Sequence, residues 1–161
     1  MPSELHDELC VRAERWLKNQ NCGVVFNDRF QAATYSGEQP DAMGFRSGCS
    51  ILIECKASRS DFLADKRKRF RKDPSIGVGD WRFYMSPPGV INVSDLPEGW
   101  GLLWAHPRKI EKVHGIPPNT QWCSKAPFVG SKNDEIRLLY SALRRVSVRG
   151  HFDCIYEKLE R

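Results

Sequence analysis

The N-terminal segment of the chain alternates apolar and polar residues with the period of a helix. Between residues 4 and 19 the apolar side chains recur at helical spacing, at Leu5, Leu9, Ala13, Trp16 and Leu17. A stripe of this kind covers one face of an α-helix. The preceding Ser3 offers a side-chain oxygen that can cap the first backbone N–H groups. The sequence therefore predicts an amphipathic helix over residues 4–19.

Short apolar runs bounded by turn residues are typical of β-strands. The run at 50–56 is rich in β-branched residues and follows a glycine, so it predicts a buried strand. Residues 41–45 predict its antiparallel partner, with 46–49 as the turn between them. Further strands are predicted at residues 23–26, 81–85, 90–93, 100–105 and 109–113.

Two more helices are expected from capping residues and apolar spacing. Ser58 and Asp61 have the spacing of a capping box, and Pro74 stops the helix, which predicts one continuous helix up to residue 72. A final helix is predicted over 132–148, after Ser131 as its cap. Its expected buried face comprises Ile136, Leu139, Tyr140, Leu143 and Val146. Strands and helices in this order predict an α/β protein.

Length and composition agree with one enzyme-sized domain over residues 1–161. The chain has 161 residues, of which 40% are hydrophobic, which is enough to bury a core. There is no apolar stretch of 18 residues, and acidic residues stand where a signal peptide would be apolar. The six cysteines contain no C-x-x-C pair, so they do not indicate a zinc ribbon. We expect a cytoplasmic, soluble protein without a membrane partner, its cysteines reduced.

The chemistry-bearing residues lie on the predicted hairpin. Side chains alternate along a strand, so Glu54 and Lys56 share one face while Cys55 points to the other. The hairpin would bring Asp41 beside Glu54. Two converging carboxylates and the main-chain carbonyl of Cys55 offer the hard oxygen ligands that Mg²⁺ prefers, and Mn²⁺ is the alternative ion. The charge of Lys56 would orient or deprotonate a water, or offset negative charge growing on a phosphate.

Asp41, Glu54 and Lys56, with Pro40 before the first acid, resemble the signature of the PD-(D/E)XK nuclease superfamily. The chain resembles most closely the MmcB-like DNA-repair proteins of that superfamily, although those tend to lack the proline. This resemblance is carried by residues 53–66, 82–84, 96–98, 101–103 and 138–139. It implies a restriction-endonuclease-like core, in which a mixed central β-sheet is flanked by helices. It also implies a role in DNA repair or in processing phage or host DNA.

A further acid and a DNA-binding surface are also expected. Members of the superfamily often add an acid from the first helix to the metal site, for which Glu8 is the first candidate and Glu38 the second. Residues 59–72 carry seven cationic and two acidic side chains, and the resulting +5 equals the net charge of the whole chain. Such a concentration of charge favours phosphate contacts. The candidate DNA-binding residues are Ser58, Arg59, Lys66, Lys68 and Arg69. Trp122 is a candidate for stacking on a base.

The sequence favours one function over two alternatives. The first is a metal-dependent deoxyribonuclease, an endonuclease or exonuclease that hydrolyses phosphodiester bonds with Mg²⁺ or Mn²⁺. The second is a DNA-binding module of the same fold that does not cut and serves a repair complex. The third is a protein-interaction adaptor in which the motif arose by chance. A nuclease of this size that cuts both strands would usually need two copies, so a homodimer is a further possibility.

Overall fold

The computed structural model describes residues 3–160 of the chain. The sheet contains β1 (Val24–Asn27), β2 (Ala42–Phe45), β3 (Ser50–Cys55), β4 (Trp81–Ser86), β5 (Gly101–Ala105) and β6 (Ile110–His114). The α-helices are α1 (Glu4–Asn19), α2 (Arg59–Asp65), α3 (Arg69–Lys72) and α4 (Lys132–Val148). Four short 3₁₀ helices complete it: η1 (Pro74–Ile76), η2 (Val93–Asp95), η3 (Asn119–Gln121) and η4 (Phe152–Tyr156). No helix in this part of the chain combines the length and apolar composition needed to cross a membrane.

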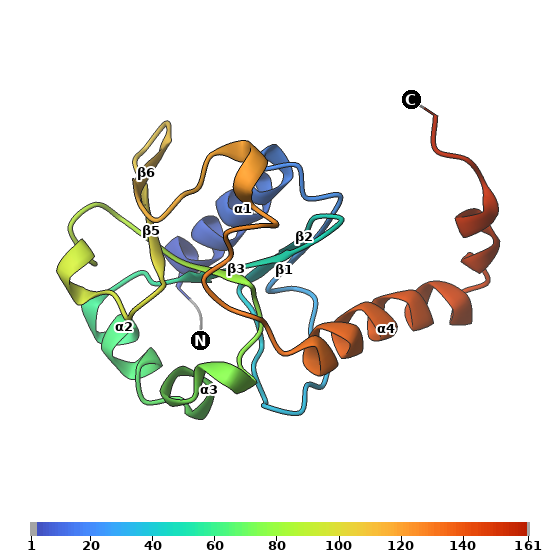
Figure 1. The fold of residues 1–161 in the computed structure, drawn as a ribbon, viewed down its shortest axis with the longest axis horizontal. Helices are drawn as coiled ribbons and strands as arrows, with labels where there is room; N and C mark the ends of the chain where they lie inside the picture. The colour runs from blue at the N-terminus through green and yellow to red at the C-terminus, as the bar shows by residue number, and fades with distance from the viewer. Residues whose placement is uncertain (1–2, 161) are drawn as a thin grey trace.

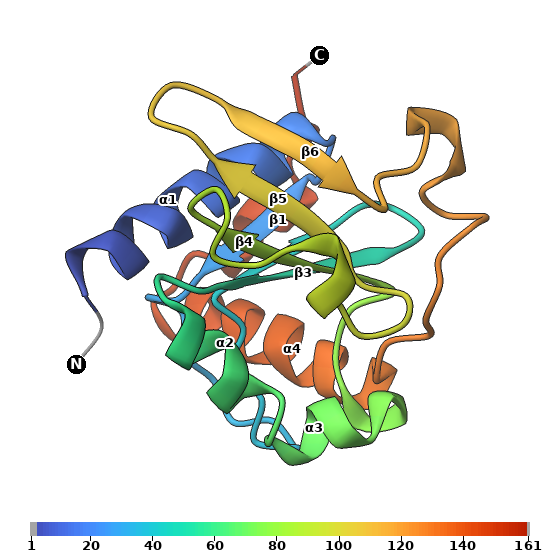
Figure 2. The same cartoon turned by 90° about the vertical axis from the view of Figure 1, so that its left-hand side faces the viewer.

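The six strands form one mixed sheet in sequence order. β3, β4 and β5 run parallel, whereas β1, β2 and β6 pair antiparallel with their neighbours. Helix α1 covers one face of this sheet, and α2 and α3 lie on the other side (Figures 1 and 2). The expectation of an α/β protein with a mixed sheet flanked by helices is therefore confirmed.

The predicted hairpin is confirmed, although β2 begins one residue later and β3 ends one residue earlier than predicted. The N–H of Arg46 donates to the carbonyl of Cys49 at 2.9 Å, which closes the turn. Ala42 is paired with Ile53, so the residue that precedes β2 lies beside the end of β3. This register places Asp41 next to the segment that carries Glu54.

Alternate residues of β3 enter two separate cores. Ile51, Ile53 and Cys55 pack with the buried face of α1, whereas Leu52 packs with Phe62 of α2 on the opposite face. Alternation along the strand then directs Glu54 to the α2 side, on the face opposite Cys55 as the sequence predicts. The catalytic candidates thus lie at the carboxyl end of a strand that is buried on both faces.

The single basic helix predicted for residues 58–72 is wrong, because the chain breaks it into α2 and α3. Lys68 is extended, with φ −66° and ψ 143°, so no helical turn passes through it. The break re-aims α3 so that Arg71 reaches the buried carboxylates of Glu38, Glu54 and Asp65. Buried carboxylates need a cation beside them, and a continuous helix would not bring Arg71 to this position.

The strand predicted at residues 90–93 is also wrong. In its place the chain makes a turn followed by η2, in which the N–H of Asp95 donates to the carbonyl of Asn92. The carbonyl of Ile91 accepts the indole N–H of Trp104 at 2.9 Å. Ile91 is thus buried, and its carbonyl has a hydrogen-bond partner, although the segment does not pair with a strand.

Helix α4 has the predicted bounds but not the predicted buried face. Ile136 is 63% exposed and Tyr140 is 64% exposed, and Leu138 is the apolar side chain that is buried. The helix is held by its first turn instead, where the carboxylate of Asp134 accepts the N–H groups of residues 35 and 36. The rest of α4 extends away from the sheet (Figure 1). An apolar stripe predicts which side of a helix is apolar, not what covers it.

Candidate active site

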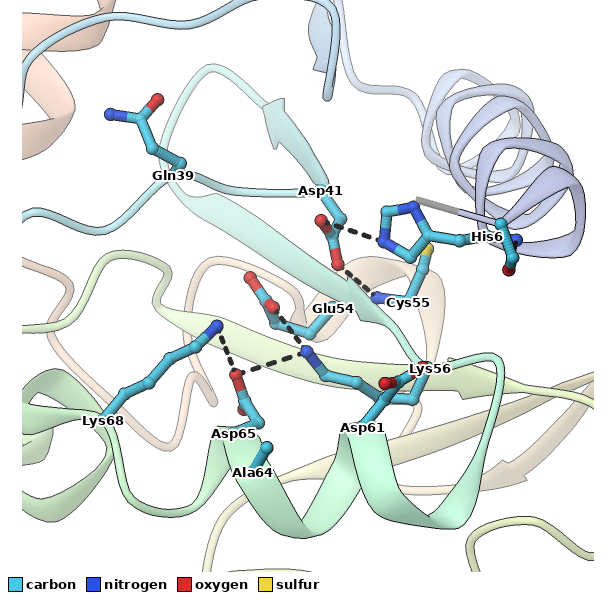
Figure 3. A pocket seen from close by; sticks show the side chains of 11 residues that line it. His6, Gln39, Asp41, Glu54, Cys55, Lys56, Asp61, Ala64, Asp65 and Lys68 are labelled. Atoms are coloured by element: carbon cyan, nitrogen blue, oxygen red, sulfur yellow. Dashed lines mark hydrogen bonds and ion pairs between the residues drawn. The ribbon is translucent and has the colours of Figure 1, made fainter. Parts of the chain in front are cut away.

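A cavity of about 480 Å³ opens at the carboxyl end of β3, between the start of α1 and α2 (Figure 3). It is lined by Ser3, His6, Gln39, Asp41, Glu54, Cys55, Lys56, Asp61, Ala64, Asp65 and Lys68. The cavity therefore brings together the three residues of the predicted motif, although Asp41 precedes β2 whereas Glu54 and Lys56 lie at the end of β3 and directly after it.

Asp41 is fixed by contacts from both sides. Its Oδ2 accepts the backbone N–H of Cys55 at 2.8 Å, and its Oδ1 lies 3.3 Å from Nε2 of His6 on α1 (Figure 3). The hydrogen bond to Asp41 raises the pKa of His6, against the lowering effect of burial. The thiol of Cys55 belongs to the core on the α1 side, so this residue turns its backbone and not its sulfur toward Asp41.

Glu54 is buried, and each of its oxygens lies near a cation. Oε2 accepts a hydrogen bond from Nζ of Lys56 at 3.2 Å, and Oε1 lies 3.1 Å from Nη2 of Arg71. That Arg71 nitrogen makes no hydrogen bond, so Oε1 keeps its acceptor capacity despite the ion pair. Burial and the neighbouring Asp41 raise the pKa of Glu54 to about 7, and the two cations oppose this shift.

Asp65 organises the cationic side of the cavity. Its carboxylate accepts the hydroxyl of Tyr84 at 2.7 Å and Nε of Arg71 at 2.9 Å, and it pairs with Lys56 and Lys68 at 3.2 and 2.9 Å. Burial alone would raise the pKa of Asp65, but these cations hold it well below its usual range. The site therefore contains a buried carboxylate, stabilised in its ionised form, in contact with Lys56.

Lys56 is a charged ammonium in this setting. Burial would lower its pKa, but Glu54 and Asp65 outweigh that effect and raise the pKa above the ordinary value. Its side chain is 8% exposed and is held between the two carboxylates. A lysine held in this way supplies a fixed positive charge, whereas a general base would have to be deprotonated.

The acidic side chains that line the cavity outnumber the lysines. Asp41, Glu54, Asp61 and Asp65 line it together with Lys56 and Lys68. Behind them Glu38 and Arg71 form an ion pair, in which the two charges offset each other. The excess of carboxylates favours the binding of a divalent cation.

The two candidates for an additional acid do not line this cavity. Glu8 is solvent-exposed and lies 3.6 Å from Arg12, one turn further along α1. Glu38 is buried, but its carboxylate accepts the N–H of Val78 at 2.9 Å and pairs with Arg71. It therefore holds the arginine behind the site and does not face the cavity.

The predicted DNA-binding residues are largely engaged within the protein. Arg59 pairs with Asp95, and Nζ of Lys66 donates to the carbonyl of that aspartate. Arg69 donates to the carbonyl of Ser36 at 3.4 Å, and Ser58 caps α2. Lys68 is the member of this set that lines the cavity. The net charge of the segment thus overstates the positive charge that it presents to a ligand.

Trp122 is not free to stack on a base. It is 1% exposed, and its ring packs edge-on against those of Trp16 and Trp81. Its carbonyl accepts the indole N–H of Trp81 at 2.6 Å. The polar residues around Trp122 in the sequence suggest an exposed side chain. Its burial cannot be predicted from them, because the residues that cover it belong to α1 and β4.

Three residues at the site escaped the sequence reasoning. The sequence gives His6 no role, and it places Asp65 and Arg71 only within the charged segment of residues 59–72. A signal existed for Asp65, since it lies within the residues 53–66 that carry the family resemblance. No local pattern indicates that His6 meets Asp41, because the contact joins elements 35 residues apart.

Comparison with known proteins adds evidence on the fold. No protein-family model matches the chain, and no curated protein sequence matches it. Among solved structures, the chain is similar to the SPO1766 protein of unknown function from Silicibacter pomeroyi, with a TM-score of 0.61 and 22% sequence identity. The match covers 93% of this chain and 94% of that chain. The two proteins therefore share the arrangement of the backbone over nearly their whole lengths.

Proposed function

We propose that this protein is a metal-dependent deoxyribonuclease with the restriction-endonuclease-like core of the PD-(D/E)XK superfamily. The observation that carries the proposal is the meeting of Asp41, Glu54 and Lys56 in one cavity at the end of β3. Two carboxylates that can hold a metal ion and a fixed ammonium at one place are suited to phosphodiester hydrolysis. The resemblance to MmcB-like proteins suggests DNA repair as the setting, and free cysteines agree with an intracellular location.

The residues present fit a divalent cation. Asp41 and Glu54 would hold it, together with the main-chain carbonyl of Cys55. The excess of carboxylates over lysines around the cavity favours such an ion. When bound, Mg²⁺ or Mn²⁺ supplies a water of lowered pKa and a Lewis acid for the phosphate. The imidazole of His6 beside Asp41 adds a nitrogen donor, which suits Mn²⁺ better than Mg²⁺.

The chain's own contribution would be electrostatic. Lys56 is held protonated by Glu54 and Asp65, so it would stabilise negative charge that develops on the phosphate and would not act as the base. Lys68 faces the same cavity with its side chain 47% exposed, in position to contact a substrate phosphate. Asp41 is oriented by the Cys55 N–H and by His6, so its geometry does not depend on the substrate.

The test is a cleavage assay with matched variants. Single-stranded, duplex and branched DNA are incubated with the protein in Mg²⁺, Mn²⁺ or EDTA, beside Lys56→Ala and Asp41→Asn. We expect metal-dependent cutting that falls by at least about a hundredfold in both variants, as for the loss of one group that stabilises the transition state. Lys112→Ala removes an exposed lysine from β6 and serves as the control.

The same assay separates the alternatives. Salt-sensitive DNA binding without cutting by any form would indicate the non-cleaving DNA-binding module, and no DNA affinity at all would indicate an interaction adaptor. Cutting of both strands of a duplex at one site would call for two active sites, and sedimentation of the complex would then show whether a homodimer forms.

A further inference from the structure

A second cavity, of about 250 Å³, lies between α1 and the turn that joins β5 to β6. It is lined by Arg12, Arg15, Trp16, Asn19, Arg108, Lys109 and Ile110. Four of these residues are cationic and none is acidic. The cavity shares no lining residue with the candidate active site.

Three of the four cations have no partner within the described chain. Arg12 is structural, since its Nη2 donates to the carbonyls of His106 and Lys109 and ties the turn to the helix. The side chains of Arg15, Arg108 and Lys109 make no ion pair and no hydrogen bond within residues 3–160. Their positive charge is therefore available to an external ligand.

The acids nearest to this cavity are already paired. Glu14 accepts hydrogen bonds from Lys18 and from the amide of Asn27, and Glu111 pairs with His106. Glu8 lies beside Arg12. The other acids of α1, Glu4 and Asp7, lie in its first turn, eight or more residues before Arg15, which is about 12 Å or more along the helix axis. Glu111 is the acid of the β5–β6 hairpin, and it is already paired. Residues 59–72 differ in this respect, because several of their cationic side chains form ion pairs with acids of the protein itself.

The remaining walls suit a phosphate group. Trp16 lines the cavity and is only 6% exposed, so its position is fixed by packing. The side-chain amide of Asn19 can donate a hydrogen bond to a phosphate oxygen. A volume of about 250 Å³ is roughly eight times the share of one water molecule in the liquid, which leaves room beyond the phosphate itself. Arg15 and Arg108 approach from two different elements, and such convergence is how arginine side chains grip a phosphate.

We propose that this cavity is a phosphate-binding subsite for the backbone of a nucleic acid, separate from the candidate active site. Arg15 follows His6 by nine residues along α1, a rise of about 13 Å. This corresponds to about four base steps of a duplex. The subsite would hold a nucleic acid beyond the position of cleavage. The choice of a nucleic acid rests on the proposed function, whereas the phosphate site itself rests on the charges around the cavity.

The test is DNA binding by fluorescence anisotropy in EDTA, so that no cleavage takes place. The double variant Arg15→Gln/Arg108→Gln is compared with Lys112→Gln/Lys158→Gln, which removes the same total charge from exposed positions outside the cavity. We expect the first pair to raise Kd about tenfold and to make the slope of log K against log salt shallower by about two. The second pair should change Kd by less than about twofold.

The outcomes distinguish this proposal from the nuclease proposal. Equal effects of the two double variants, or no binding of DNA by the unmodified protein, would overturn the subsite. A second arm titrates pyrophosphate into the unmodified protein and into Arg15→Gln/Arg108→Gln, with binding followed by calorimetry. Binding of pyrophosphate that is lost in this variant, without any affinity for DNA, would mean a site for small phosphate compounds and would overturn the nucleic-acid assignment. Binding that is retained in Lys56→Ala, with no cutting by any form, would sink the nuclease proposal and leave the subsite standing.

Discussion

Replacing Asp65 by asparagine tests the network that holds Lys56. The substitution keeps the shape of the side chain but removes a charge that is fully buried and that contacts Lys56, Lys68, Arg71 and the hydroxyl of Tyr84. Breaking a buried ion pair by removing one partner costs about 3–5 kcal/mol, because the other charge is left uncompensated. A typical domain is stable by only about 5–15 kcal/mol, so the loss should be a large part of the total.

The measurement is urea unfolding followed by tryptophan fluorescence, together with the melting temperature. For a chain of 161 residues the expected loss of unfolding free energy lowers the melting temperature by roughly 6–20 °C. Asp61→Asn is the matched control, because that acid lies on the same helix but is exposed, and its replacement should cost less than about 1 kcal/mol. If both variants lose the same stability, or Asp65→Asn loses less than about 1 kcal/mol, the buried network does not hold the site together as described.

Three further predictions concern stability in the absence of metal. The pKa of Glu54 is about 7 in the fold, above its ordinary 4.5, so the folded chain binds more protons between these values. Its contribution to the unfolding free energy should therefore fall by about 3 kcal/mol as the pH rises from 4.5 to 7. Glu54→Gln should flatten the wild-type pH profile by that amount, and identical profiles would refute the shift. Trp122→Ala should cost about 3–5 kcal/mol in urea unfolding, against less than about 0.5 kcal/mol for the exposed Tyr35→Ala; a small effect of the first would mean that Trp122 is not core. On α4, Leu138→Ala should cost about 2–5 kcal/mol and Ile136→Ser less than about 0.5 kcal/mol, and the reverse order in thermal melts would show that the helix packs through its other face.

Local sequence alone determined the elements that carry the proposed motif. Ser3 caps α1 by accepting the N–H of His6, as its position before an apolar stripe predicts. The β2–β3 hairpin and the shared face of Glu54 and Lys56 follow from alternation and from a short turn. These features depend on residues that are neighbours in the chain, and neighbours obey periodicities of 3.6 and 2 residues wherever the segment is placed.

Only the tertiary structure decided which side chains meet and which surfaces stay open. His6 meets Asp41, and Arg71 reaches Glu54, across segments that carry no shared pattern. The exposure of the apolar face of α4 and the burial of Trp122 were set by what other elements cover. Charge counting failed at residues 59–72 for the same reason, because a sum of charges does not record which cations are already paired. Long-range contacts are chosen by packing and by the cost of burying an uncompensated charge, and both depend on the whole fold.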